Sequence, residues 1–379
     1  MRNILFFVSA HHSKDDRFFY HQAKALVNEQ YNVSIFSFLE NKNEVLENIN
    51  ICSREINSLS ICKQLKYCQA VLKQKKPFLI ICDNPKTVIL ATRYKMKNKC
   101  KVVYDITEWY PSKKNFPVAS TNFFAKIVRA IFLILINFVA GLCSDLLIFG
   151  EYYKSLPFLL FFWKKRGIIR YYPDLQYINN VKPRFIHDEI RLLYSGKFNI
   201  DKGIDKVIEV AKLTALKSKK TVVKLNLIGF FGCEEDKKLI EKLSANLPGN
   251  MTIDIRPYLD FKLYCESIVN NDVFLDLRVK DIENNHCLPI KIFYYMASGR
   301  PVIYSDLKSI KKEIVTDEIG LFCNPDNVNE IANHICTYIE QQSLYESHCQ
   351  NSLNASQKLY NWKKEEKIFL DLIKGMIDD

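Results

Sequence analysis

Short apolar runs alternate with amphipathic helical patterns along the whole chain, and this alternation constrains the fold more than any other feature. The candidate strands are residues 4–10, 32–38, 78–82, 102–105, 146–149, 168–171, 191–194, 224–228, 252–255, 273–277, 301–304 and 321–323. Helical patterns lie between them, for example at 18–29, 206–216 and 288–298. Because strands that alternate with helices form parallel sheets with helices on their faces, the sequence predicts an α/β protein.

A chain of 379 residues is longer than one compact core usually accommodates, so two domains are expected. The segment 172–188 contains Pro173 and Pro183 without a clear period, which is typical of a linker. We therefore predict two doubly wound, Rossmann-like domains and an amphipathic C-terminal helix, at 1–185, 186–355 and 356–379. Ligands of such domains bind beyond the carboxyl ends of the strands, so the cleft between the two domains is the expected site.

Positive charge is concentrated in the first half of the chain. Residues 1–185 contain 28 Lys and Arg against 13 Asp and Glu, whereas the remaining residues contain 26 against 29. This basic half indicates an anionic partner, either nucleic acid or a membrane surface, unless it is a solvated lysine-rich surface. The sequence contains no zinc-ligand spacing, helix-turn-helix or RNP-like aromatic motif, so we expect no nucleic acid partner.

The 12 cysteines are scattered, and none forms a Cys-x-x-Cys pair. They indicate buried thiols in a reducing compartment. The apolar run at 4–8 is too short for the hydrophobic region of a signal peptide and fits a first strand better. We therefore expect a cytoplasmic protein.

Two segments combine bulky apolar residues with cations. The first, 123–143, is interrupted by Lys126, Arg129 and Asn137, and no transmembrane helix is predicted because its unbroken apolar run is too short. The second, 156–166, ends in four residues typical of a lipid interface, Trp163, Lys164, Lys165 and Arg166. Both segments also fit core helices, but the second favours peripheral binding to an anionic membrane surface.

The first motif with a chemical meaning is the strand–loop–helix segment 194–205, in which the strand ends near Gly196. A glycine allows a ligand to approach the backbone closely. Lys197 and Lys202 bring two positive charges to this strand end, and the following helix adds the partial positive charge of its N-terminus. The combination suits a diphosphate, although an ordinary turn with solvated lysines has the same pattern.

The second motif is the segment 288–303. A helix is predicted to open near Pro289 and to end at Gly299, after which Pro301 begins a buried strand. The polar loop 278–287 precedes this helix and is expected to reach toward a ligand.

Together the two motifs resemble the retaining nucleotide-sugar glycosyltransferases of family 4, which have the GT-B architecture of two facing Rossmann-like domains. Lys197 and Lys202 match the basic pair that this family places on the donor diphosphate, and 288–303 matches its second motif. The resemblance extends to 15–17, 103–111, 171–173 and 362–372, the last being similar to the helix that crosses back to the first domain. It implies the donor-binding residues Gly196, Lys197, Lys202, Glu283, His286, Leu288, Pro289, Ile290 and Tyr294.

Three positions depart from the family pattern. His286 and Tyr294 stand where the family has glutamates for the donor sugar and the ribose, and Thr107 stands where it often has a histidine. Glu283 is a candidate replacement carboxylate, while His286 also fits a solvated loop histidine. The acceptor-side residues are predicted to be His11, Arg17 and Thr107, with Asp16 and Glu108 as catalytic candidates beside Lys197 and Lys202.

The resemblance further implies transfer of a hexosyl or acetylhexosaminyl group with retention, by a front-face attack that the leaving diphosphate assists. The expected partners are a nucleotide-sugar donor, a lipid-linked glycan acceptor of cell-surface polysaccharide biosynthesis and the inner face of the cell membrane. No metal or other cofactor is expected. A nucleotide-sugar epimerase of the same fold and a non-catalytic sugar-nucleotide binder are the alternatives.

Overall fold

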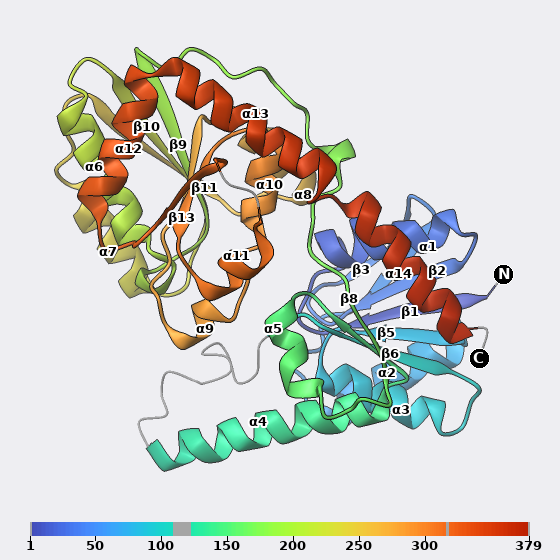
Figure 1. The fold of residues 1–379 in the computed structure, drawn as a ribbon. Coiled ribbons are helices and arrows are strands. Elements are labelled where there is room, and N and C mark those ends of the chain that lie inside the picture. The colour runs from blue at the N-terminus through green and yellow to red at the C-terminus, as the bar shows by residue number, and fades with distance from the viewer. Residues whose placement is uncertain (1, 109–122, 316–317, 378–379) are drawn as a thin grey trace. The chain divides into compact units, whose positions relative to one another are not determined.

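The computed structural model describes residues 2–108, 123–315 and 318–377, which form two compact units (Figure 1). Unit 1 comprises residues 1–171 and 362–379, and unit 2 comprises residues 172–361. The segment 172–185, which the sequence analysis assigned to the first domain, thus belongs to unit 2. Its first residue explains the difference, because the ring of Tyr172 packs on Phe293 and Tyr360 in the core of unit 2.

Unit 1 is built on an eight-stranded sheet in the order β3-β4-β2-β1-β5-β6-β7-β8. Neighbouring strands are parallel except β3 and β4, an antiparallel hairpin that the sequence analysis did not predict. The strands are β1 Asn3–Val8, β2 Asn32–Ser37, β3 Lys42–Leu46, β4 Ile49–Ser53, β5 Leu79–Cys82, β6 Lys101–Ile106, β7 Leu146–Phe149 and β8 Lys165–Ile168. The helices are η1 Asp16–Ala23, α1 Lys24–Asn28, α2 Ile61–Lys75, α3 Pro85–Lys95, α4 Phe123–Cys143, α5 Tyr152–Ser155, η3 Leu156–Phe158 and α14 Trp362–Ile377.

The direction of the crossovers decides which face of this sheet each helix covers. The connections through α2, α3 and α4 all advance the same way along the sheet, so right-handed crossovers place these helices on one face. Their residues Leu72, Val88 and Ala140 accordingly share one core cluster. The connection from β1 to β2 runs the other way, so its helices η1 and α1 lie on the opposite face of the sheet. Helix α14 packs beside them, where the ring of Trp362 stacks on His21 with centroids 4.6 Å apart.

Unit 2 has a six-stranded, fully parallel sheet in the order β11-β10-β9-β12-β13-β14. The strands are β9 Glu189–Phe198, β10 Val222–Phe231, β11 Met251–Pro257, β12 Val273–Asp276, β13 Val302–Ser305 and β14 Gly320–Cys323. The helices are η4 Leu175–Tyr177, η5 Ile200–Lys202, α6 Ile204–Lys217, α7 Glu234–Ser244, α8 Phe261–Ile268, α9 Ile282–Asn285, α10 Lys291–Ala297, α11 Lys308–Glu313, α12 Val328–Glu340 and α13 Gln342–Lys358.

Most of the expected elements are present, and two are displaced. The strand expected at 168–171 is β8, which lies three residues earlier because Lys165–Ile168 is the segment that pairs with β7. The helix expected to open near Pro289 is α10, which begins two residues later. Its predicted end is confirmed, since Gly299 has a φ of 69°, the left-handed conformation of a helix cap.

Helix α4 corrects the prediction that no segment has the properties of a membrane span. It is one unbroken helix of 21 residues, and Lys126, Arg129 and Asn137 do not interrupt it. The stretch Phe124–Cys143 has a mean hydropathy of 2.1 and is apolar enough, by length and composition alone, to cross a membrane. Only 17% of it is buried, so most of this helix lies outside the core, and only its C-terminal half packs on the core cluster of unit 1.

Candidate functional site

In each unit the direction of strand addition reverses at one point of the sheet. β1 lies between β2 and β5 in unit 1, and β9 lies between β10 and β12 in unit 2. Helices leave such a switch point toward opposite faces, which opens a crevice at the carboxyl ends of the two strands where ligands of α/β sheets bind. A cluster of polar side chains lies at the switch point of each unit.

Lys202 lies at the centre of the cluster in unit 2. Its ammonium donates to Asn284 Oδ1 at 2.9 Å, and Asn284 Nδ2 in turn donates to the carbonyl oxygens of Asp201 and Val279. These bonds hold the loop after β12 against η5. Burial lowers the pKa of Lys202, and the neighbouring cation Arg278 lowers it further. An anionic ligand at this position is favoured because it relieves both effects.

Arg278 and Asp276 come from the end of β12 and form a buried ion pair. The guanidinium donates to both carboxylate oxygens, at 2.7 and 3.0 Å. The carbonyl of Arg278 accepts a hydrogen bond from Ser305 at the end of β13. Neither residue was among the predicted site residues, although Arg278 opens the polar loop 278–287 that was expected to reach toward a ligand.

Gly196 brings a further cation to the same edge of the sheet. Its φ of 142° is rarely adopted by other residues, and a Cβ here would lie 3.2 Å from Lys291 Nζ and 3.5 Å from the Tyr194 hydroxyl. Lys291 is the first residue of α10, so the second motif contributes a lysine that the sequence analysis had not singled out. The backbone of Gly196 is therefore accessible only because it lacks a side chain.

The two lysines expected to hold a diphosphate together have different neighbours. Lys197 is exposed, and a Cβ on Gly232 would lie 2.0 Å from its Cε, which places the lysine over the turn between β10 and α7. Lys202 instead contacts α9. Lys197 is a residue of β9 and Lys202 ends η5, which follows that strand, and the structure shows no shared protein partner for them among the described residues.

The remaining predicted donor residues divide into two groups. Glu283 lies near Lys202, where its charge offsets part of the lowering of the Lys202 pKa by burial. His286 is half-buried, and its Nδ1 lies 2.6 Å from the carbonyl oxygen of Ile282. Tyr294 is buried, with its ring packed edge-on against Phe261 and Tyr264. Leu288, Pro289 and Ile290 directly precede α10, and Leu288 is part of the core of unit 2. A role of these residues in donor binding stays a prediction.

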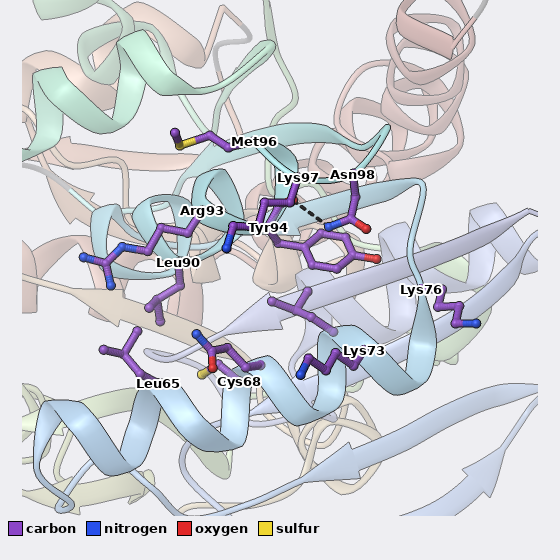
Figure 2. A pocket seen from close by; sticks show the side chains of 12 residues that line it. Leu65, Cys68, Lys73, Lys76, Leu90, Arg93, Tyr94, Met96, Lys97 and Asn98 are labelled. Carbon is purple, nitrogen blue, oxygen red and sulfur yellow. Dashed lines mark hydrogen bonds between the residues drawn. The ribbon is translucent and has the colours of Figure 1, made fainter.

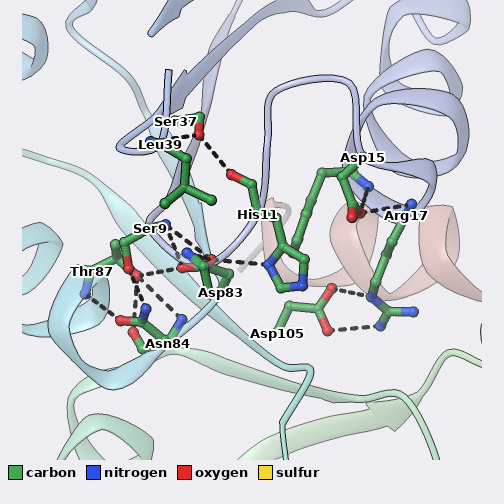
Figure 3. Close-up of polar contacts among 12 residues, drawn as sticks. Ser9, His11, Asp15, Arg17, Ser37, Leu39, Asp83, Asn84, Thr87 and Asp105 are labelled. Atoms are coloured by element: carbon green, nitrogen blue, oxygen red, sulfur yellow. Dashed lines mark hydrogen bonds and ion pairs between the residues drawn. The ribbon is translucent and has the colours of Figure 1, made fainter. Parts of the chain in front are cut away.

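Asp83 organises the cluster in unit 1 (Figure 3). It follows β5, and its carboxylate accepts the backbone N–H groups of Ser9 and Ala10, which follow β1, at 3.0 and 2.7 Å. The same carboxylate lies 3.1 Å from His11 Nδ1. These contacts join the two strands of the switch point and fix the ring of His11.

Three carboxylates surround His11. Burial alone would lower the pKa of His11, but Asp15, Asp83 and Glu108 outweigh it and raise the pKa to about 9. Burial also raises the pKa of Asp15, to about 7. His11 is therefore protonated at neutral pH and can donate a hydrogen bond to a ligand. The structure brings Glu108 to this cluster, as a catalytic role for it requires.

Arg17 does not have the position expected of an acceptor contact. It is 1% exposed, and its guanidinium donates to both oxygens of Asp105 at 2.7 Å and to the carbonyl of Ile169 at 2.9 Å. The ring of Tyr171 covers it, with 4.0 Å between the guanidinium carbon and the ring centre. Because its side chain is buried between Asp105, Ile169 and Tyr171, Arg17 has a structural role in place of the predicted contact with the acceptor.

The other acceptor-side candidates lie near these groups. Asp16 accepts the backbone N–H of Arg17 at 2.9 Å. Thr107 is buried, and its hydroxyl has no hydrogen-bond partner in the described part of the chain. Among the residues that the structure describes, no three His, Cys, Asp or Glu side chains are grouped to hold a metal ion. Independence from metals stays a prediction.

A cavity of about 900 Å³ lies between α2 and α3 (Figure 2). Lys73 and Lys76 line it from the end of α2, and Arg93 and Lys97 line it from the end of α3. Helices of a parallel α/β sheet end at the edge opposite to the carboxyl ends of the strands. The cavity is therefore separate from the polar cluster of unit 1.

Known proteins resemble this chain both in the sequence of unit 2 and in the fold of the whole chain. Residues 178–355 match the family model "Glycosyl transferases group 1". A search of curated protein sequences finds no match. The matched segment contains the whole polar cluster of unit 2.

Several solved structures share the fold of the entire chain. Sucrose-phosphate synthase from Thermosynechococcus elongatus has a TM-score of 0.75 and 15% identity over 100% of both chains. HepE from Anabaena, in complex with UDP, has a TM-score of 0.70 and 13% identity over 99% of this chain and 100% of its own. WaaG, a glycosyltransferase of lipopolysaccharide biosynthesis, has a TM-score of 0.67 and 13% identity over 97% and 98%. The chain therefore has the GT-B fold of two Rossmann-like domains.

Proposed function

We propose that this chain is a glycosyltransferase that takes a sugar from a nucleotide-sugar donor bound at the switch point of unit 2. The observation that carries the proposal is the match of residues 178–355 to the glycosyl transferases group 1, because this segment contains the cluster around Lys202. The similar fold of HepE, solved with UDP and with UDP-glucose, supports a donor of this class.

The proposed reaction exchanges one bond at C1 of the sugar for another. The bond from C1 to the diphosphate oxygen breaks, a bond from C1 to an acceptor hydroxyl oxygen forms, and the acceptor proton passes to the leaving diphosphate. Negative charge grows on the diphosphate during this step, so preorganised cations accelerate it. Lys202 and Lys291 are the cations best placed for this role, while Asp276 fixes Arg278 between the strands.

Unit 1 is the proposed acceptor unit. His11 is held by Asp83 and protonated at neutral pH, so it can donate a hydrogen bond to an oxygen of the acceptor. Glu108 and Asp16 stay the catalytic candidates on the acceptor side. The resemblance to family 4 supports retention at C1 and a hexosyl or acetylhexosaminyl donor. The positive charge of residues 1–185 supports a lipid-linked acceptor in cell-surface glycan synthesis at the inner face of a membrane.

The proposal is tested with purified protein and a panel of nucleotide sugars. We expect transfer, or slow donor hydrolysis, that releases nucleoside diphosphate. Lys202→Met should lower kcat by about 10²–10³-fold, as loss of one charge partner of a transition state does. Lys219→Met is the matched control, because this exposed lysine follows α6 at the other edge of the sheet, and it should leave kcat unchanged.

Other outcomes identify the alternatives. Binding without turnover indicates a non-catalytic sugar-nucleotide binder, which His286 and Tyr294 in place of two carboxylates would explain. Interconversion of free donors indicates an epimerase. Because cations of the protein face the diphosphate, we expect EDTA to leave transfer intact, and a loss that Mg²⁺ restores would contradict the metal-free mechanism.

A further inference from the structure

An apolar stripe runs along the exposed side of α4. Eight large side chains on this helix are 40–71% exposed, and they recur every three or four residues, which places them along one broad face. Among them are Phe124, Val128, Phe132, Leu135, Val139 and Leu142. A contiguous apolar surface of this size on a water-exposed helix marks an interaction site.

The segment after α5 extends this surface. Its side chains at 159, 160, 162 and 163 are 53–79% exposed, and the last of them is Trp163. Phe158 and Phe161 attach the segment to α4, since both rings pack on Phe138 with centroids 5.6 Å apart. We call the exposed side of α4 together with residues 159–163 the apolar platform.

The contact between the two parts of the apolar platform is close and fixed. A Cβ on Gly141 would lie 2.7 Å from the Phe158 ring, so the segment can approach α4 only at a glycine. Lys164 Nζ donates to the carbonyl oxygens of Leu142 and Ser144, both at 2.6 Å, and so closes the C-terminal end of α4. The platform is therefore part of the folded unit.

The cations predicted to contact a membrane have partners inside the protein. Besides Lys164, Lys165 donates to the carbonyl of Gly375 at 2.8 Å and Arg166 donates to the carbonyl of Phe158 at 3.2 Å. Replacing these three residues would disturb unit 1 as well as any lipid contact. Trp163 is 60% exposed, so its indole is available for the predicted lipid contact.

Helix α4 cannot cross a bilayer while unit 1 is folded. It connects β6 to its neighbour β7, and its C-terminal half is part of the core of the unit. The hydroxyl of Tyr104 on β6 donates to Asn137 Oδ1 at 2.6 Å in a buried hydrogen bond. A spanning position would break this bond and separate the helix from the sheet, so only a position in the plane of an interface is compatible with the fold.

The charges around the apolar platform are positive. Lys126 and Arg129 are exposed on α4 itself. The cavity beside the adjacent α3 is lined by four cations and by no acidic residue, and Figure 2 shows Arg93 and Lys97 on its α3 side. Apolar insertion flanked by Lys and Arg is the combination that binds anionic lipid.

We propose that the apolar platform inserts into the interfacial region of an anionic phospholipid leaflet, with α4 in the membrane plane and the surrounding cations at the headgroups. A second copy of the chain is a poorer occupant, because α4 carries Lys126 and Arg129 but no acidic residue, so a symmetric contact through α4 would offer these cations no opposite charge. The proposal does not depend on sugar transfer, and it places a lipid-linked acceptor at the same surface as unit 1.

Co-sedimentation with vesicles of phosphatidylcholine containing phosphatidylglycerol tests the proposal. We expect the wild type to pellet with these vesicles at 0.1 M salt and much less with phosphatidylcholine alone. At 1 M salt binding should weaken, because the Debye length falls from about 10 to about 3 Å, while the apolar contribution persists. The indole emission of the wild type should shift to the blue with vesicles, and the shift should be smaller in Trp163→Phe.

The decisive variant is the triple replacement Phe132→Ser, Leu135→Ser and Val139→Ser on the exposed stripe. It should lower the vesicle partition coefficient at least tenfold and leave turnover of a soluble acceptor analogue unchanged. A matched control replaces three apolar residues elsewhere that are 56–74% exposed, Val45, Ile61 and Leu216, by Ser and should bind like the wild type.

Three outcomes would overturn the proposal. Wild-type protein that stays in the supernatant with anionic vesicles at low salt shows that lipid is not the partner. Equal binding of the triple variant and the wild type shows that the platform is not the contact. A lipid-free dimer in sedimentation equilibrium that the triple variant abolishes shows that a second copy covers α4. If every variant, including the wild type, fails to transfer sugar, the proposed function is contradicted. The three vesicle and oligomer results can still be interpreted, because none of them depends on turnover.

Discussion

Replacing Arg17 by Met tests whether its guanidinium builds unit 1 or contacts the acceptor. In the structure Arg17 and Asp105 are both fully buried and joined by two hydrogen bonds of 2.7 Å. The methionine keeps most of the aliphatic stem but removes the charge that compensates Asp105. The carboxylate then retains one donor in this network, Gln22 Nε2 at 2.6 Å.

The expected cost follows from the burial of the remaining charge. Removing one partner of a buried ion pair typically destabilises a protein by about 3–5 kcal/mol, because the other charge is left uncompensated. We therefore expect Arg17→Met to lower the free energy of unfolding of unit 1 by about 3–5 kcal/mol. Adding Asp105→Asn should recover a large part of this loss, since an uncharged amide is cheaper to bury.

Urea denaturation followed by tryptophan fluorescence measures this change in unit 1 alone. None of the three tryptophans lies within residues 172–361, which form unit 2, so unfolding of unit 2 contributes little to the signal. The double-mutant cycle should give a coupling energy above about 1 kcal/mol. A loss below about 1 kcal/mol in Arg17→Met, combined with a raised KM for the acceptor, would refute the structural role and restore the acceptor contact.

Three further predictions follow from the two clusters and the backbone. Lys197→Met should reduce kcat less than Lys202→Met, because Lys197 lies over another turn; equal losses in steady-state kinetics would contradict this. His11 has a folded pKa of about 9, above its unfolded value of 6.5, so its stabilisation is complete below about pH 6.5 and is lost as the pH rises toward 9. NMR titration of His11 measures this pKa directly. The difference in the free energy of unfolding between the wild type and His11→Gln should become smaller as the pH rises from 6.5 to 9. Gly203→Ala should destabilise unit 2 by at least about 1–3 kcal/mol in urea, because φ is 75° and the new Cβ would lie 1.9 Å from a backbone oxygen, whereas Gly249→Ala should be nearly neutral.

The sequence by itself determined the fold class and most of the elements. Alternating apolar runs and helical patterns depend on local periodicity, which is visible in any short window. The strands at 146–149 and 273–277, the end of α10 at Gly299 and the last helix were predictable for this reason. The hairpin of β3 and β4 was missed because β3 is largely exposed and carries charged residues in place of an apolar run.

The sequence also led to Lys202, Gly196 and His11, since each follows a predicted strand in a polar loop. It gave no indication of their partners. Asn284 lies 82 residues after Lys202, and Asp83 lies 74 residues after Ser9. Such pairs depend on which strands are neighbours in the sheet.

The role of the charged and apolar side chains was likewise decided only by the tertiary structure. Composition made α4 apolar, and the resemblance to family 4 made Arg17 a candidate ligand. The packing of α4 on one side only left its stripe in water, and the position of Asp105 on β6 buried Arg17. Burial and pairing are properties of the assembled sheet, because they arise from contacts between segments that no local pattern connects.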